Sequence, residues 1–220
     1  MAERKWLTFG RIAYCYLEDG LVHKTYKPLE ELGDLLPEDP TARAQIENVR
    51  TRGLAHEWTP AHRKFMFGME VSKLAALTGD DGFPQLISAD FRTLGLVMTY
   101  AGPDILEYDG PIPTYREMLP TLKSMYKRLR RSRVPYRDVH PANICWDGEK
   151  LRLVDFSWGG WEKVPEEKFL GRWKWSLKAE NRDRQRRERK ERIQSMIETG
   201  EDIVRALKYE GEDGEDDHKG

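Results

Sequence analysis

A group of polar residues around a predicted β-hairpin limits what this chain can fold into more than any other feature. Residues 134–160 read VPYRDVHPANICWDGEKLRLVDFSWGG, in which two short apolar runs flank an Asp-Gly pair. Such a pair between two apolar runs is typical of a hairpin turn. Four polar residues stand just before and after the hairpin: Asp138, His140, Asn143 and Asp155. The hairpin would return Asp155 to the side of Asn143, so we expect a polar site there.

The rest of the chain predicts an α+β fold. Runs rich in aromatic and β-branched residues indicate strands, and apolar residues at helical spacing indicate helices. The expected elements, in chain order, are an antiparallel sheet around the Asp19-Gly20 turn, a short helix near 41–52, a helix over 63–77, two strands within 83–102, a helix over 114–131, the hairpin, and two or three charged helices after Pro165.

Composition and charge narrow the functional class. The 37 basic and 38 acidic residues nearly cancel, so no overall field would attract nucleic acid or an anionic membrane, and either partner would need a local patch. We do not expect nucleic acid as a partner. No apolar run approaches the roughly 20 residues that span a bilayer, and the N-terminus does not resemble a signal peptide. Cys15 and Cys145 form no disulfide framework and read as small buried hydrophobes. We expect a globular protein of the cytoplasm or nucleus.

Two segments, YRDVHPAN and LRLVDFSWG, together with the order of the elements before them, resemble the protein kinase-like superfamily. The first segment is most similar to the small-molecule branch, the aminoglycoside and choline phosphotransferases and the lipopolysaccharide kinases, where Asp-x-His-x-x-Asn is typical. The resemblance spans roughly residues 5–160. It implies a two-lobed kinase-like fold with a small antiparallel-sheet N-lobe over 1–102 and a shortened, mainly helical C-lobe over 103–209. The last residues, 210–220, have almost nothing to bury, so we expect a disordered acidic tail there.

The resemblance also implies a reaction. It implies ATP and Mg²⁺ as cofactors and transfer of the γ-phosphoryl group to a hydroxyl on a small molecule or a protein. Asp138, preceded by Arg137, would orient that hydroxyl and accept its proton, while Asn143 and Asp155 would bind Mg²⁺ through oxygen atoms. His140 would brace the loop. Taken singly, these residues read as loop caps and turn formers, and only their joint spacing favours the kinase-like interpretation.

In the first lobe the resemblance implies a lysine for the α- and β-phosphates and a helical glutamate that holds it. Lys24 lies on the same strand face as Val22 by the two-residue period, whereas Lys27 falls on the opposite face. Glu70 is the expected partner of Lys24. The alternative for Glu70 is a solvated pair with Lys73, three residues further along the same helix.

The stretch GLVMTYAG resembles the strand and hinge that receive adenine. Met98 would be the gatekeeper, and the backbone of Thr99, Tyr100 and Ala101 would form the hydrogen-bonding edge. An ordinary buried strand that leads into a turn is the alternative interpretation.

Several departures from the pattern leave other functions open. Only Gly10 stands where a protein kinase has a glycine-rich loop, and no Ala-Pro-Glu signature follows the hairpin. A pseudokinase-type binding or scaffold module without turnover is the main alternative, and a charged structural or RNA-binding protein is a third. The basic run NRDRQRRERKER has interleaved acids and reads as a solvated helix face. The tryptophans between 158 and 175 read as a cover for the core rather than an acceptor platform.

Overall fold

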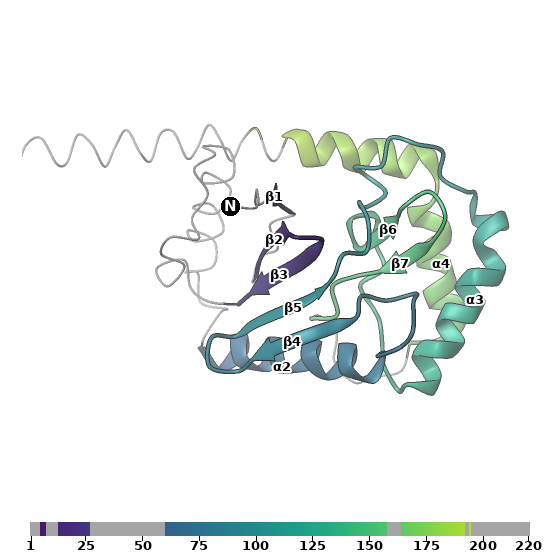
Figure 1. The fold of residues 1–220 in the computed structure, drawn as a ribbon. Helices are drawn as coiled ribbons and strands as arrows, with labels where there is room; N and C mark the ends of the chain where they lie inside the picture. Colours follow the sequence, from purple (N-terminus) through teal and green to yellow (C-terminus); the bar gives the residue numbers. More distant parts are fainter. Residues whose placement is uncertain (1–4, 8–12, 27–59, 158–163, 192–193, 195–220) are drawn as a thin grey trace, which may run out of the picture.

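The computed structural model describes residues 5–7, 13–26, 60–157, 164–191 and 194. Within them the chain forms an antiparallel sheet, a second small hairpin and several helices, which confirms the predicted α+β class (Figure 1). The predicted helix near 41–52, the tail over 210–220, Gly10 and Lys27 lie outside the described residues.

The main sheet has five strands in the order β1-β2-β3-β5-β4. The strands are β1 (Lys5–Trp6), β2 (Tyr14–Glu18), β3 (Leu21–Thr25), β4 (Leu86–Asp90) and β5 (Gly95–Thr99). Asp19 and Gly20 join β2 to β3 with positive φ angles of 51° and 75°, the backbone that a tight two-residue hairpin turn requires. Because β3 pairs with β2 on one side and β5 on the other, its side chains have fixed faces.

Helix α2 (Pro60–Ala76) lies along the sheet next to β4 (Figure 1). It starts three residues before the predicted start at residue 63 and ends one residue before the predicted end at residue 77. Phe67 is fully buried and its ring meets the Tyr26 ring edge-on at 5.8 Å. The helix thereby holds its next inward turn, which carries Glu70, against the centre of the sheet.

The second part of the chain begins with α3 (Tyr115–Arg131). Thr114 and Glu117 form a capping box, in which each side chain accepts a hydrogen bond from the backbone N–H of the other residue. Helix α4 (Glu166–Ser176) packs against α3, with the Phe169 and Tyr126 rings 5.3 Å apart. Trp173 is fully buried there, whereas Trp175 is exposed, so the expected core-covering role holds for Trp173 and not for Trp175. Trp158 and Trp161 lie outside the described residues.

A short hairpin and a charged helix complete this part. The predicted hairpin forms from β6 (Ile144–Trp146) and β7 (Leu151–Leu153), and the short 3-10 helix η3 (Pro141–Asn143) leads into it. Residues 179–191 form the charged helix, which crosses the top of Figure 1. Its expected solvated character holds for one face only, because Arg186 and Arg189 on the other face bond to the segment after β5.

Candidate active site

Lys24 reaches the interior because of the register of β3. The strand alternates partly exposed and buried residues, so Val22 and Lys24 share the buried face, and Tyr26 continues it one step beyond the strand. Lys24 is only 7% exposed. A lysine so deeply buried requires nearby carboxylates.

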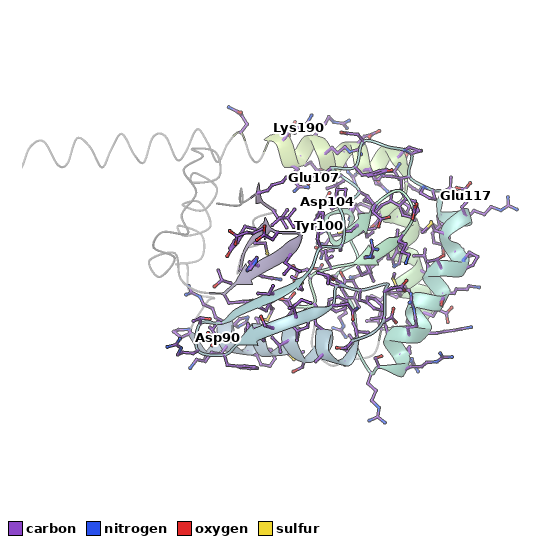
Figure 2. The ribbon with its side chains drawn as sticks, in the orientation of Figure 1. Asp90, Tyr100, Asp104, Glu107, Glu117 and Lys190 are labelled. Carbon is purple, nitrogen blue, oxygen red and sulfur yellow. The ribbon has the colours of Figure 1, made fainter. Side chains whose placement is uncertain are left out.

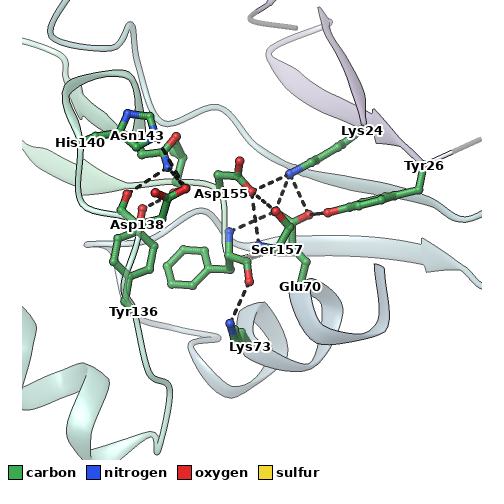
Figure 3. Close-up of polar contacts among 12 residues, drawn as sticks. Lys24, Tyr26, Glu70, Lys73, Tyr136, Asp138, His140, Asn143, Asp155 and Ser157 are labelled. Atoms are coloured by element: carbon green, nitrogen blue, oxygen red, sulfur yellow. Dashed lines mark hydrogen bonds and ion pairs between the residues drawn. The ribbon is translucent and has the colours of Figure 1, made fainter. Parts of the chain in front are cut away.

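Glu70 of α2 is the first of these carboxylates, and it is fully buried. Lys24 Nζ lies 2.9 Å from it, and the Tyr26 hydroxyl donates to its other oxygen (Figure 3). The backbone N–H of Phe156 also donates to Glu70, at 3.3 Å. Three donors from two separate segments therefore meet on one buried carboxylate and satisfy it.

Lys73 follows Glu70 by one turn of α2 and is fully buried as well. Its ammonium group donates to the carbonyl of Phe156 at 3.1 Å. Burial lowers the pKa of Lys73 to about 8, although the nearby carboxylates of Glu70 and Asp155 raise it. One helix thus binds both backbone polar groups of Phe156, and the solvated surface position considered for Lys73 is wrong.

Asp155 is the second carboxylate beside Lys24, at 3.1 Å. It has a positive φ of 59°, an uncommon backbone state for a non-glycine residue that turns the chain sharply after β7. Burial raises its pKa, but Lys24 and the hydrogen bonds from Ser157 and Lys24 outweigh burial, so the pKa lies below its ordinary value. At 35% exposure, the Asp155 side chain stays ionised and open to a ligand.

Asp138 and Asn143 form the opposite side of the site (Figure 3). The Asn143 side-chain amide donates to the carbonyl oxygen of Asp138 at 3.0 Å and to its carboxylate at 3.1 Å. Both contacts use the amide nitrogen, which leaves the amide oxygen of Asn143 as its remaining polar side-chain atom. His140 Nε2 lies 3.6 Å from the Asp138 carboxylate. Arg137 is partly exposed.

The two sides are joined by backbone contacts of the hairpin. The Val154 N–H donates to the Asn143 carbonyl at 3.1 Å, and the buried Tyr136 hydroxyl donates to the Val154 carbonyl at 2.6 Å. These bonds fix Asp155 relative to the loop that carries Asp138. The structure therefore brings together Lys24, Glu70, Asp138, Asn143 and Asp155 in one place.

The four residues proposed for adenine lie at the end of β5. Met98 is buried between Val22 of β3 and Leu86 of β4. The Thr99 N–H and hydroxyl are both engaged by the backbone of Gln85, and the Ala101 carbonyl accepts from Arg152 at 3.3 Å. Tyr100 is partly buried. These groups of Thr99 and Ala101 are therefore already hydrogen-bonded within the protein.

Sequence reasoning missed Tyr26 and the inward role of Lys73. Tyr26 lies two residues after Lys24, so the same period that placed Lys24 inward would have placed Tyr26 beside it. Lys73 has no such signal, because a lysine three residues from a glutamate is the usual pattern of a solvated pair.

The donor set fits a hard divalent cation. Within the described residues no cluster of three or more His, Cys, Asp or Glu side chains is present. The Asp155 carboxylate and the Asn143 amide oxygen are both hard oxygen donors, and Mg²⁺ typically takes one or two protein oxygens and fills its shell with water and phosphate. These two residues could hold Mg²⁺ in that manner, beside the ammonium group of Lys24.

Comparison with known proteins adds only distant similarity. No protein-family model matches the chain, and no curated protein sequence matches it significantly. The fold is similar to a mutant kinase domain of PknI from Mycobacterium tuberculosis, with 17% identity over 70% of this chain and 57% of that one at a TM-score of 0.40. It is also similar to the Rio2 kinase from Chaetomium thermophilum, solved with ADP/Mg²⁺ and phosphoaspartate, with 12% identity over 79% and 54% of the two chains at a TM-score of 0.45.

The chain spans little more than half the length of either solved structure. Both TM-scores lie below 0.5, so we interpret the site from its own contacts. No helix among the described residues is long and apolar enough to cross a membrane.

Proposed function

We propose that this chain is a kinase-like phosphotransferase that uses ATP and Mg²⁺ and transfers the γ-phosphoryl group to a hydroxyl acceptor. The observation that supports it most is the position of Lys24, whose ammonium group lies between the carboxylates of Glu70 and Asp155. Phosphoryl transfer needs a cation for the phosphates and oxygen ligands for a metal, placed beside a group that orients the acceptor. The division into lobes over 1–102 and 103–209 is part of this proposal.

The proposed role of each residue follows from its contacts in the site. Burial lowers the pKa of Lys24, but Asp155 and Glu70 outweigh burial and raise it well above its ordinary value, so Lys24 keeps the charge that phosphate oxygens need. Asp155 and Asn143 would hold the metal, and Met98 to Ala101 would border the adenine. When bound, Mg²⁺ supplies charge neutralisation across the phosphates. Asp138, 35% exposed and oriented by Asn143, would accept the acceptor's proton, with Arg137 beside it.

The second candidate is a pseudokinase-type module that binds nucleotide without turnover. The ion pair between Lys24 and Asp155 favours it, because the residue proposed for the metal is already neutralised by protein. A nucleotide with its metal would have to break the ion pair between Lys24 and Asp155 before both residues could bind it. The two candidates share their fold and differ in whether the γ-phosphoryl group is transferred to an acceptor.

Paired substitutions separate these candidates. Asp155→Asn should abolish Mg²⁺-dependent ATP binding and turnover together, because it removes the charged metal ligand. Asp138→Asn should leave ATP binding close to wild type and lower turnover by about 10² or more, the scale of a positioned acid–base residue. Calorimetry and ADP release, measured on the same preparations, give both quantities. The exposed Asp109→Asn is the matched control and should change neither.

A thermal-shift titration with ATP, with and without Mg²⁺, tests binding first. A ligand at about 100 times its dissociation constant stabilises the folded state by roughly 2.7 kcal/mol, which is readily measured. If wild type binds ATP but releases no ADP with any acceptor tried, and Asp138→Asn behaves identically, the pseudokinase candidate replaces the enzyme. No shift at millimolar ATP would remove both.

A further inference from the structure

The outer face of the second half of α3 carries only positive charge. Its exposed positions from Thr121 onward contain two hydroxyl residues and four cations, and a fifth cation follows the helix: Thr121, Lys123, Ser124, Lys127, Arg130, Arg131 and Arg133. We call these seven residues the α3 basic surface. It contains no carboxylate and no apolar side chain. In a chain whose 37 basic and 38 acidic residues nearly cancel, this is segregated charge rather than the average surface.

The five cations of this surface are not used by the described part of the protein. Among the described residues, none of the five side chains has an ion pair or a hydrogen bond, whereas Arg128, one position away, is bonded to Asp80. At Arg131 the α3 basic surface borders a cavity of about 410 Å³, which Asp80 and Asp81 also line. In Figure 2 side chains project from the outer side of α3 into solvent.

The charged helix over 179–191 provides a contrast within the same chain. Its exposed cations alternate with carboxylates, and Arg184 pairs with Glu188. That helix is close to neutral along its open face. Among the described residues, no ion pair offsets the repulsion among the five neighbouring cations on and after α3, so an anionic partner would relieve it.

We propose that the α3 basic surface binds the sugar–phosphate backbone of a nucleic acid. The four helical cations recur at three- and four-residue steps, so they form a row that follows the helix axis over about 12 Å, at 1.5 Å per residue. Arginine and lysine in such a row match successive phosphates of one strand, and the two hydroxyl residues can donate to phosphate oxygens. This proposal differs from the expectation, drawn from overall composition, that nucleic acid is no partner.

The absence of apolar side chains from this surface decides between this partner and the other polyanions. A protein partner is normally held by buried aromatic or aliphatic anchors, and an anionic membrane by apolar residues that enter the lipid. The apolar residues of α3, such as Leu122 and Leu129, are buried in the core and are not available for either. Phosphate backbones alone are bound mainly through charge.

Charge reversal on the full chain tests this proposal. Fluorescence anisotropy with labelled 15-nucleotide RNA and DNA should show binding at 50 mM salt that weakens as salt rises. The triple variant Lys123→Glu, Lys127→Glu, Arg130→Glu should bind at least about tenfold more weakly, and its salt slope should be smaller by about 0.7 for each phosphate that it no longer neutralises. The probe that binds with the lower dissociation constant shows whether the partner is RNA or DNA.

The matched control reverses three exposed cations elsewhere: Arg92→Glu, Arg187→Glu, Lys190→Glu. It changes net charge equally and should weaken binding less than about threefold. Equal weakening by the two triple variants, or no binding at 50 mM salt, would overturn the proposal. So would equal or tighter binding of a polyglutamate peptide, or of vesicles that contain phosphatidylserine. The proposal is independent of phosphoryl transfer, and the α3 variant should keep wild-type melting temperature and ATP binding.

Discussion

Lys73 lies in an unusual environment for a lysine. A fully buried lysine that donates to a backbone carbonyl carries a desolvation cost, which is why burial lowers its pKa to about 8. Its position is nevertheless useful, because it holds the residue that follows Asp155. A charge that the fold disfavours has a measurable consequence for stability.

We predict that the contribution of Lys73 to the free energy of unfolding becomes more favourable as the pH rises above neutrality. Below about pH 8 the lysine is charged in both states, and the folded state bears the cost of burial. Between about pH 8 and 10.5 the unfolded chain binds the extra proton, so raising the pH favours folding. The free energy of unfolding of wild type relative to Lys73→Met should therefore rise by about 2 to 3 kcal/mol from pH 7 to pH 10. Urea unfolding of both proteins at several pH values measures it, and a difference that stays flat would contradict the buried position.

At the scale of elements, the helix over 179–191 is attached to the segment that follows β5. Arg189 bonds to Asp104 and Glu107, each at 2.9 Å, while Arg186 donates to the carbonyls of Ile105, Leu106 and Tyr108. Asp104 and Glu107 lie beneath this helix in Figure 2. The same segment pairs with the hairpin, since the Ile105 N–H donates to the Ile144 carbonyl. The helix therefore supports the backbone on which Asn143 depends.

Removal of one arginine should show this support. Arg189→Met leaves the Asp104 carboxylate, only 7% exposed, without its cation, and should destabilise the protein by about 2 kcal/mol or more in urea unfolding. Asp104→Asn in the same background should recover part of the loss, because it removes the unpaired charge. Arg187→Met, on the exposed face of the helix, is the control and should stay within about 0.5 kcal/mol of wild type. Equal effects of the two arginines would show that the helix is not anchored.

At the scale of the whole molecule, one hydrophobic core runs through both parts of the described chain. It contains Val22 and Leu96 of the sheet together with Leu122 of α3 and Phe169 of α4. Phe156 lies between the parts, in ring contact with Phe83 on one side and Tyr136 on the other. The residue after Asp155 is thus also a packing centre.

We predict that the two parts unfold together. Most of the described tryptophans lie in the second part, namely Trp146, Trp173 and Trp175, so tryptophan fluorescence reports mainly on that part. Far-ultraviolet circular dichroism reports on both parts. A shared core should make the fluorescence and circular dichroism transitions coincide in urea, as expected for two-state unfolding. Two separated transitions would show instead that the two parts are independent units.

The sequence by itself determined the local features of this protein. The Asp19-Gly20 turn, the faces of β3 and the hairpin before Asp155 follow from backbone geometry over a few residues, and the structure contains all three. The roles of the site residues stay predictions, although the resemblance named residues that the structure places together.

Only the tertiary structure decided the contacts between distant segments. Tyr26 bonds to Glu70 across 44 positions, Lys73 to Phe156 across 83, and Arg189 to Asp104 across 85. Periodicity can assign a residue to one face of its own element, but the pairing depends on which faces meet when the core packs. The α3 basic surface has the same origin: total charge is nearly zero, and only the packing of α3 shows which of its cations stay exposed and unpaired within the described part of the chain.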